Sequence, residues 1–253
     1  MTAIDLNADL GESFGRWTLP GDEDLLSLVS SANIACGFHG GDPLTMQRTV
    51  GLASARGVTI GAHPSYRDLV GFGRRELGAT PAEIAGDVTY QTGALEAFCR
   101  QAGVRVRYIK LHGALYHRAA ADKDVAKAVA VALRQLDPEL IVLGLEGSAL
   151  LQAANQLGLG ISREAFADRA YLPDGRLLPR SEPGAVLDDV DLIAERAMRM
   201  VVDRHVVAVD GTRVIVRADS LCVHGDGPRA TAIVRGLRQR FEAEGITVAP
   251  FVR

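Results

Sequence analysis

The sequence predicts an α/β fold of the (β/α)-barrel class. Strand-like and helix-like segments alternate along the chain, and about seven such βα units can be distinguished. Polar residues follow nearly every expected strand, and neither a GxGxxG motif nor a P-loop follows the first one, which disfavours an open nucleotide-binding sheet. Seven units instead of eight predict an imperfect seven-stranded barrel. We expect residues 1–253 to form one domain with its reactive residues at the carboxyl ends of the strands.

The spacing of apolar residues and the positions of capping residues predict where the individual strands and helices lie. Alternating or continuous apolar runs predict strands over residues 4–10, 32–37, 58–63, 104–112, 140–145, 161–166 and 218–223. Helical spacing predicts helices over residues 44–56, 81–102, 122–136, 191–203 and 228–244, with another after Ser148. Asp210 and Gly211 predict a hairpin over residues 206–216, and Pro and Gly predict a long loop over residues 171–189.

Composition excludes several classes of protein. Hydrophobic residues make up 47% of the 253, which is enough for a sizeable core. The net charge of −3 and the lack of a dense Lys/Arg tract argue against a nucleic-acid partner. Three cysteines without a CxxC pair fit a reducing compartment better than a disulfide framework. Neither a secretory leader nor a membrane-spanning apolar run is recognisable, so we expect a cytoplasmic protein with no membrane partner.

The first expected strand carries the densest polar pattern. Alternation places Asp5, Asn7 and Asp9 on one face, which points into a barrel if the apolar residues between them pack outward. A buried carboxylate costs several kcal/mol unless it is paired, so such a cluster is costly to keep for packing alone. Asp5 could be a structural acceptor low in the barrel. Asp9 and Glu12 lie nearer the mouth, where a functional role is favoured.

The next two strand ends add histidines and arginines. His39 follows the second strand beside glycines that let a ligand approach the backbone, and Asp42 is expected to cap the following helix. His63 ends the third strand before a proline. Arg74 and Arg75 could clamp a carboxylate or phosphate, although at least one of them is expected to be an ordinary solvated loop residue.

The fourth strand places Lys110 and His112 on one face. A lysine within an apolar strand needs a carboxylate partner, and the acids of the first strand are the candidates. A structural Lys–Asp pair and a catalytic lysine are both compatible with this pattern.

Later segments supply further candidates. Asp168 and Arg169 precede the long loop, which could act as a lid that excludes water. His224 and Asp226 follow the last core strand, and Asp226 could chiefly cap the terminal helix. No HExxH motif or Gly-x-Ser-x-Gly elbow is present. A metal site is conceivable because strand-end residues could converge, namely His39, His63, His112, His224 and Asp9.

Ordered stretches across almost the whole chain resemble the LamB/YcsF family, the A subunits of 5-oxoprolinase. They are LNADLGE (6–12), SANIACGFHGGD (31–42), GAHPSY (61–66), GFGRR (71–75), KLHGALY (110–116), EAFADRAY (164–171), DGRLLPR (174–180) and CVHGDG (222–227). The resemblance implies a seven-stranded barrel related to the glycoside hydrolase/deacetylase superfamily. It also implies ATP-dependent opening of 5-oxoproline to glutamate, with ATP as co-substrate, as Mg-ATP, and with the B and C subunits of 5-oxoprolinase as partners.

The resemblance also suggests how the residues divide the work. Leu10 stands where metal-dependent sugar deacetylases have a metal-binding Asp, which argues against a deacetylase-type metal site, whereas Asp9 matches the position of their general base. Asp9 would then act on water with His39 or His112 orienting it, Lys110 would stabilise the developing anion or phosphate, and Arg74 would hold the substrate carboxylate. The remaining candidates for substrate binding are Asn7, Glu12, His63, Asp168, Arg169, His224 and Asp226.

Two other functions fit the same residues. One is a stand-alone, metal-dependent amide or sugar deacetylase. The other is a non-catalytic, substrate-binding subunit of the complex. Since no Walker A loop is present, nucleotide binding could lie largely in the partner subunits.

Overall fold

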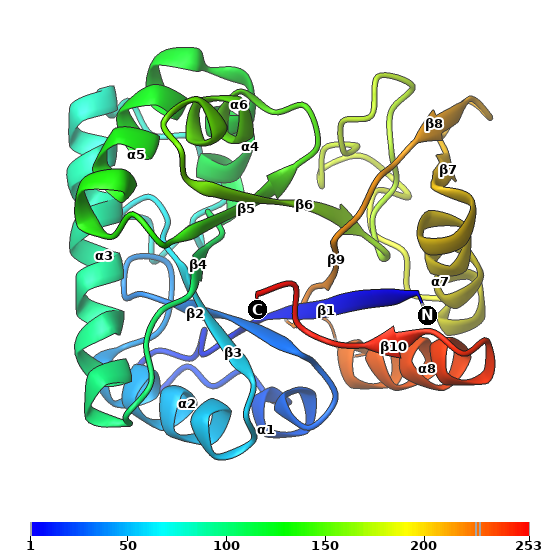
Figure 1. Cartoon of the computed structure of the whole chain (residues 1–253), viewed down its shortest axis with the longest axis horizontal. Coiled ribbons are helices and arrows are strands. Elements are labelled where there is room, and N and C mark those ends of the chain that lie inside the picture. The colour runs from blue at the N-terminus through cyan, green and yellow to red at the C-terminus, as the bar shows by residue number, and fades with distance from the viewer. Residues whose placement is uncertain (1, 226, 228, 253) are drawn as a thin grey trace.

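The computed structural model describes residues 2–225, 227 and 229–252. Within them, seven parallel strands close into a barrel in the order β1-β2-β3-β4-β5-β6-β9, with β9 hydrogen-bonded back to β1 (Figure 1). The predicted imperfect seven-stranded barrel is confirmed. These strands are β1 (Ala3–Leu10), β2 (Ser31–Ala35), β3 (Thr59–His63), β4 (Tyr108–Ile109), β5 (Ile141–Leu145), β6 (Gly160–Phe166) and β9 (Ser220–Val223).

Helices surround the barrel, and most of the core lies between them and the strands. Asp42 and Thr80 cap two of the helices with their side chains, as their positions before Pro43 and Pro81 predict. The helices are α1 (Asp22–Leu26), α2 (Pro43–Ala55), α3 (Pro81–Gln101), α4 (Gly113–Ala121), α5 (Lys123–Leu136), α6 (Ala149–Gln156), α7 (Val190–Met198) and α8 (Ala230–Ala243). A π-helical turn over Arg199–Asp203 extends α7. The predicted start of the last helix, Pro228, lies outside the described residues.

Four elements differ from the expectation. The strand predicted over residues 104–112 shrinks to β4, because Lys110 and His112 bond through their backbone N–H groups to the β3 side alone. The prediction missed α1 and α4: α1 is only five residues long, and His112 at the N-cap of α4 makes no capping side-chain bond. It also missed β10 (Thr247–Val248), a two-residue strand that pairs with the start of β1.

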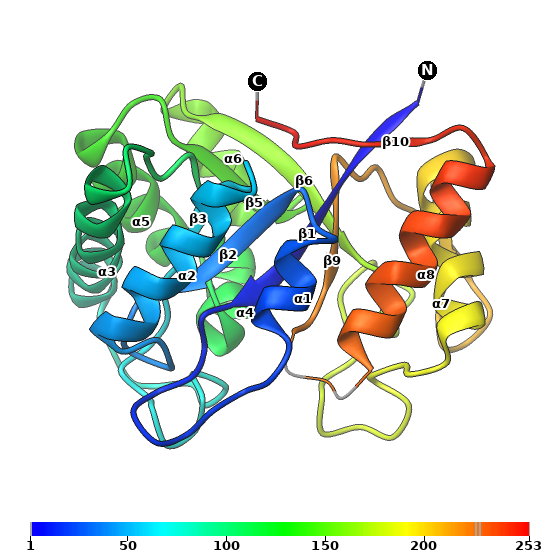
Figure 2. The same ribbon diagram turned by 90° about the horizontal axis from the view of Figure 1, so that it is seen from below.

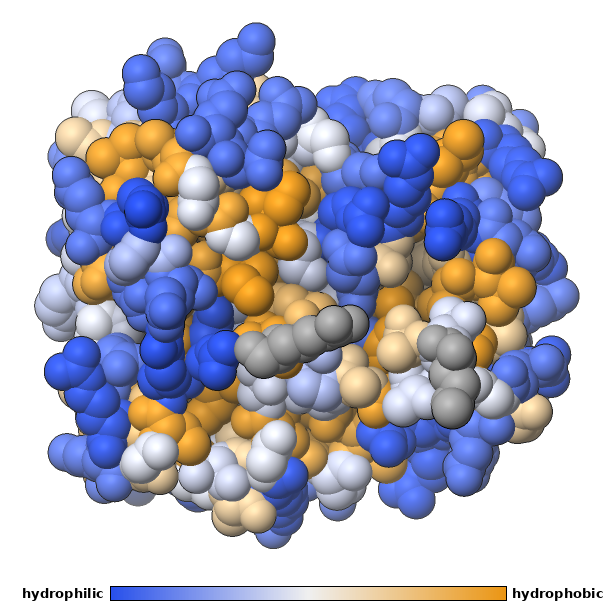
Figure 3. Space-filling model, in the orientation of Figure 1, coloured by the Kyte–Doolittle hydropathy of each residue, from blue (hydrophilic) through white to orange (hydrophobic). Residues whose placement is uncertain are grey.

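The chain's C-terminal segment covers the amino-terminal end of the barrel. Val252 packs with Tyr108 and Leu143, and the Phe251 ring meets the Tyr108 ring edge-on at 5.0 Å. Figure 3 views this face, on which hydrophobic side chains form patches between hydrophilic ones. The opposite end of the barrel is therefore the end left for a site.

The loops at the carboxyl ends of the strands gather on the side away from the two termini. Figure 2 shows that the β1–α1 loop and the segment between β6 and α7 project on that side. Within the latter segment, isolated bridges join Arg169 to Val186 and Tyr171 to Leu177, so the predicted loop has a fixed internal structure. The predicted hairpin is confirmed as β7 (His205–Val207) and β8 (Arg213–Ile215).

None of the described helices combines the length and the apolar character needed to cross a membrane.

Asp5 has the structural role that its place low in the barrel suggested. Its carboxylate is buried and accepts hydrogen bonds from the hydroxyls of Ser30, Ser31 and Ser220. Burial raises the pKa of Asp5 to about 6, although these hydroxyls oppose the rise. The folded protein therefore holds this proton more tightly than the unfolded chain does.

We expect this proton to make stability depend on pH. Because the folded pKa is raised, the Asp5 contribution is complete below pH ~4 and is lost as the pH rises through ~6, by about 3 kcal/mol in total. Urea unfolding of wild type and Asp5→Asn across that range measures it, since only wild type has the Asp5 proton to lose. Identical pH dependence in both proteins would contradict the assignment.

Candidate functional site

A buried lysine lies at the centre of the polar cluster. Lys110 Nζ lies 2.9 Å from Asp9 Oδ1, 2.9 Å from Glu164 Oε1, 3.2 Å from Asn7 Oδ1 and 3.0 Å from Cys222 Sγ. The expected pair between Lys110 and a first-strand acid is thus present. Burial by itself would lower the pKa of Lys110, but Asp9, Cys222 and Glu164 together raise it well above its usual value. Lys110 is a permanent cation in this setting.

Asp9 is the anion that faces this cation. Its Oδ1 accepts a hydrogen bond from Asn33 Nδ2 at 2.8 Å and lies 3.4 Å from His63 Nε2. Burial would raise the pKa of Asp9, but His63 and Lys110 outweigh it and hold the pKa well below its usual value. The carboxylate is therefore ionised at neutral pH and only 5% exposed.

Two histidines continue the cluster and meet nitrogen to nitrogen. His63 Nδ1 lies 2.8 Å from the Lys110 carbonyl oxygen, and His112 Nε2 lies 2.9 Å from the Phe72 carbonyl oxygen. Their other ring nitrogens, His63 Nε2 and His112 Nδ1, are 2.9 Å apart. The end of β3 and the N-cap of α4 hold the two rings in this arrangement.

His39 and Glu12 form the outer edge of the same cluster. His39 Nε2 lies 3.0 Å from Glu12 Oε1, and the His39 ring stacks on His112 with 3.7 Å between ring centroids. Burial is the main cause that lowers the pKa of both His39 and His112 well below the usual histidine value. Neither ring is readily protonated at neutral pH.

The loop after β3 closes over these rings with a strained backbone. Phe72 has a positive φ of 54°, which is uncommon for a bulky residue, and its ring meets His39 and His112 edge-on. At Gly73, a Cβ would lie 2.8 Å from the His112 ring. The GFGRR stretch is thus the backbone wall of the site.

A second acid–histidine pair lies across the barrel mouth. His224 Nδ1 lies 2.9 Å from Asp168 Oδ2, and the His224 ring stacks on Phe166. A Cβ at Gly225 would come within 2.2 Å of the Asp9 carbonyl oxygen, so only glycine lets the last strand end approach the first this closely.

The cluster opens into a narrow cavity of about 40 Å³ with basic residues at its rim. Arg74, which lies over the Phe72 ring at 5.0 Å, borders this cavity together with Arg180 and His117. The same three residues also border a wider depression on the side of α4. An anion entering from that side would meet two guanidinium groups before it reached Lys110.

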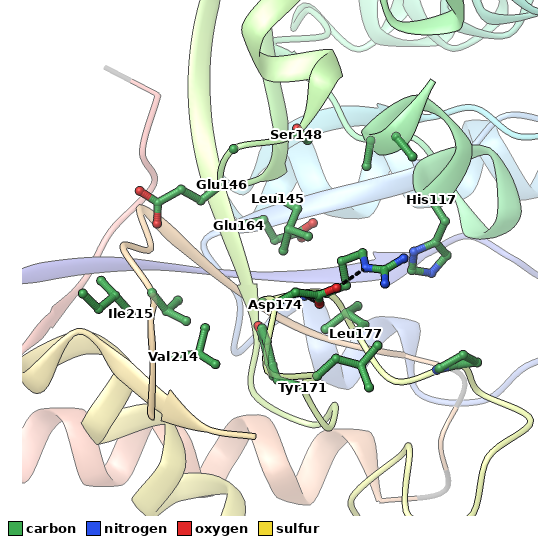
Figure 4. A pocket seen from close by; sticks show the side chains of 18 residues that line it. His117, Leu145, Glu146, Ser148, Glu164, Tyr171, Asp174, Leu177, Val214 and Ile215 are labelled. Atoms are coloured by element: carbon green, nitrogen blue, oxygen red, sulfur yellow. Dashed lines mark hydrogen bonds and ion pairs between the residues drawn. The ribbon is translucent and has the colours of Figure 1, made fainter. Parts of the chain in front are cut away.

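A larger cavity of about 690 Å³ lies beside the polar cluster. Figure 4 shows Glu164 from β6 and His117 from α4 bordering it, together with Tyr171 and Leu177 of the long loop. Its wall is mostly apolar, and Val214 and Ile215 of the hairpin complete it. Glu164 therefore links this cavity to Lys110 through their ion pair.

Most of the predicted site residues come together, and a few do not. One connected network contains Asn7, Asp9, Glu12, His39, His63, Lys110 and His112. Asn7 lies deeper in the barrel, where it bonds Ser220 and Asn33. Arg169 donates to the carbonyls of Ala185 and Leu178, so it holds the long loop. Asp226 lies outside the described residues.

The sequence prediction overlooked several residues of this site. Glu164 and Cys222 were not assigned a role, although alternation along their strands points both inward to Lys110. Arg180 and His117 at the rim were not predicted, because Arg180 lies in the long loop and the helix that carries His117, α4, was itself missed. His117 is exposed, yet it borders all three of the cavities described above.

Fold and site together define a (β/α)-barrel protein with a buried acid, lysine and histidine cluster where barrels of this class have their active sites. The family model of the LamB/YcsF family matches residues 4–253. The chain belongs to that family.

Its relatives match over nearly their full length. A protein of Streptomyces avermitilis that is named as the A subunit of 5-oxoprolinase is 56% identical, with 98% of this chain and 99% of the relative covered. A protein of Agrobacterium fabrum that is named as A subunit 1 of 5-oxoprolinase is 51% identical, with 99% and 98% covered. The crystal structure of a lactam utilization protein from Thermus thermophilus superposes with a TM-score of 0.93 at 46% identity, covering 98% and 99%.

Proposed function

We propose that this chain is the A subunit of 5-oxoprolinase. With the B and C subunits it would carry out the ATP-dependent hydrolytic opening of 5-oxo-L-proline to L-glutamate. Full-length relatives at 56% and 51% identity that are named for this subunit support the assignment. Reaction in the cytoplasm, where ATP is supplied, is part of the proposal.

The observation that carries a catalytic role is the ionised Asp9–Lys110 pair at the floor of the narrow cavity. Asp9 Oδ1 and Lys110 Nζ are 2.9 Å apart, and both groups also border that cavity. A purely structural pair needs no access to a cavity. A fixed base beside a fixed cation is instead an arrangement that accelerates water attack on a carbonyl.

The chemistry divides into three steps. The lactam oxygen takes the γ-phosphoryl group of ATP and releases ADP. Water then adds to the activated ring carbon and gives up one proton to the base. The resulting hydroxyl loses the second proton as the new carbonyl forms, and the C–N bond breaks while the nitrogen takes up a proton and leaves as the free amine. The product of that step is an acyl phosphate, which a second water hydrolyses to glutamate and phosphate.

The residues have separate parts in the ring-opening step. Asp9 accepts the proton from water, and His63 and His112 border the same cavity beside it. Lys110 stabilises the negative charge that develops on the carbonyl oxygen or its phosphate. As Lys110 turns toward that charge, its hold on Asp9 weakens, which raises the pKa of Asp9 and makes it a stronger base.

ATP enters as co-substrate, as Mg-ATP. No Walker A loop occurs in the sequence, so we assign nucleotide binding chiefly to the partner subunits. The cluster also includes histidine and carboxylate groups close enough to one another to hold a divalent cation.

The rim arginines are assigned to the substrate carboxylate. Arg74→Ala is expected to raise the KM for 5-oxoproline about 10- to 100-fold with a smaller change in kcat, because one charge-assisted hydrogen bond contributes about 1.5–3 kcal/mol. Steady-state glutamate formation by the assembled complex measures both constants. Arg100→Ala, which removes an exposed arginine on α3, is the matched control. An unchanged KM in the Arg74 variant would remove it from the site.

A reconstitution experiment tests the proposed function. The chain is mixed with its B and C partners, 5-oxoproline and ATP, and glutamate and phosphate are measured while each component is omitted in turn. We expect both products only from the full mixture. Glutamate formation without this chain would overturn the proposal, and hydrolysis of acetylated sugars by the chain alone would favour a deacetylase.

A further inference from the structure

His63 and His112 meet through one nitrogen of each ring. If both rings are neutral, neither of these two nitrogens carries a hydrogen atom. A carbonyl oxygen only accepts, so the bonds to the Lys110 and Phe72 carbonyls place N–H on His63 Nδ1 and on His112 Nε2. The two remaining nitrogens then face each other at 2.9 Å with lone pairs only. Such a contact is repulsive unless a cation lies between them or beside them.

Two carboxylates lie close enough to the His63–His112 nitrogen pair to contact a cation bound between the rings. Glu12 Oε1 is 3.5 Å from His112 Nδ1, and Asp9 Oδ1 is 3.4 Å from His63 Nε2. Glu12, His63 and His112 are all at least nine-tenths buried. Lys110 already faces Asp9 and Glu164, and burying the further Glu12 carboxylate is costly without a compensating positive charge.

We infer that this chain holds a divalent transition-metal ion, with His63 Nε2, His112 Nδ1 and one Glu12 carboxylate oxygen as its protein ligands. Two histidines and one glutamate are the ligand set of a catalytic type of zinc site, which leaves a fourth position open. The inference does not depend on the proposed function, because the ion is detected on the isolated chain.

The distances suit such an ion after small movements. Tetrahedral ligands at about 2.0–2.1 Å from zinc are about 3.3 Å from one another. The nitrogen pair at 2.9 Å and the Glu12–His112 pair at 3.5 Å bracket this value. The two carbonyl bonds also match the usual outer support, in which a metal-binding histidine donates its other N–H to an oxygen.

His39 has a supporting part in this site. Its Nε2 contacts Glu12 Oε1, and its Nδ1 is buried without a hydrogen-bond partner among the described residues. Binding the metal through Nε2 would put an unpaired N–H at Nδ1, which costs about 1–3 kcal/mol. His39 instead donates Nε2–H to Glu12 and fixes that carboxylate. The open position then takes water, whose pKa the bound ion would lower.

A second group of residues with metal-binding side chains is not assigned as a metal site. Asp9, Cys222 and His224 converge. However, Lys110 Nζ already lies 2.9 Å from Asp9 and 3.0 Å from Cys222, so the positive charge at that point is the lysine.

Metal content and Co²⁺ spectroscopy of the full-length chain test the inference. After chelation and reloading, wild type should retain about one Zn²⁺ or Co²⁺ per chain, and the Co²⁺ form should show intense visible absorption typical of low coordination. Glu12→Gln and His112→Asn should each weaken binding more than about 100-fold, and His39→Asn about 10- to 100-fold. His205→Asn, which alters a histidine of β7 outside the cluster, is the control and should bind like wild type.

The result that overturns the inference is equally direct. If folded wild type, checked by circular dichroism, retains no metal and gives no visible Co²⁺ band, the histidine pair shares a proton instead. Binding by Glu12→Gln equal to that of wild type would also overturn it. Either result would leave the 5-oxoprolinase assay untouched, so the two proposals fail separately.

Discussion

Asp9→Asn is expected to lower the coupled rate of glutamate formation by at least about 100-fold, because a general base typically contributes about 10²–10⁴. The amide keeps the size of the carboxylate and can still accept the bonds from Asn33 and Lys110. What it loses is the ability to take a proton from water. The loss should therefore appear in kcat more than in KM.

Two controls separate catalysis from assembly. Asp174→Asn changes an exposed aspartate of the long loop and should leave the rate unchanged. Size-exclusion chromatography should show the Asp9 variant in the complex with its B and C partners at the wild-type proportion. Near-normal turnover by an assembled Asp9→Asn complex would remove Asp9 from the reaction.

Lys110→Met is expected to lower the free energy of unfolding by about 3–5 kcal/mol, because breaking a buried ion pair leaves an uncompensated charge. Methionine fills a similar volume, so the effect is electrostatic. Asp9 and Glu164 would both lose the cation that lies 2.9 Å from each of them.

The dependence of this deficit on pH identifies its cause. Without Lys110, the folded-state pKa of Asp9 rises, so the variant regains stability relative to wild type as the pH falls toward ~4. Urea unfolding at several pH values measures this trend. Lys127→Met on the exposed face of α5 is the control and should change stability by less than about 0.5 kcal/mol. A deficit in Lys110→Met that stays constant with pH would point to packing instead.

The sequence was sufficient to predict the barrel and the pairing of Lys110. Period-two alternation placed Asp5, Asn7 and Asp9 on one face, and a lysine in an apolar strand had to meet an acid there. Both predictions rest on local rules that hold wherever a strand is half buried. The same rules failed over residues 104–112, because two-sided pairing depends on the neighbouring strand and not on local composition.

The arrangement within the site could not be predicted in this way. Nothing in the sequence indicates that His112 donates to the Phe72 carbonyl, because that bond depends on a strained turn 40 residues away. The Asp168–His224 pair likewise joins residues 56 apart in the chain. Roles in a site depend on which nitrogen or oxygen faces which partner, and tertiary packing decides that.

A single-turnover experiment tests the ring-opening role of this chain most directly. Complexes containing wild type or Asp9→Asn, in excess over labelled 5-oxoproline, are mixed with Mg-ATP and quenched over time, and ADP and glutamate are quantified. We predict that the variant forms ADP while glutamate formation slows by at least about 100-fold. Glutamate formation at the wild-type rate in the variant complex would contradict the account.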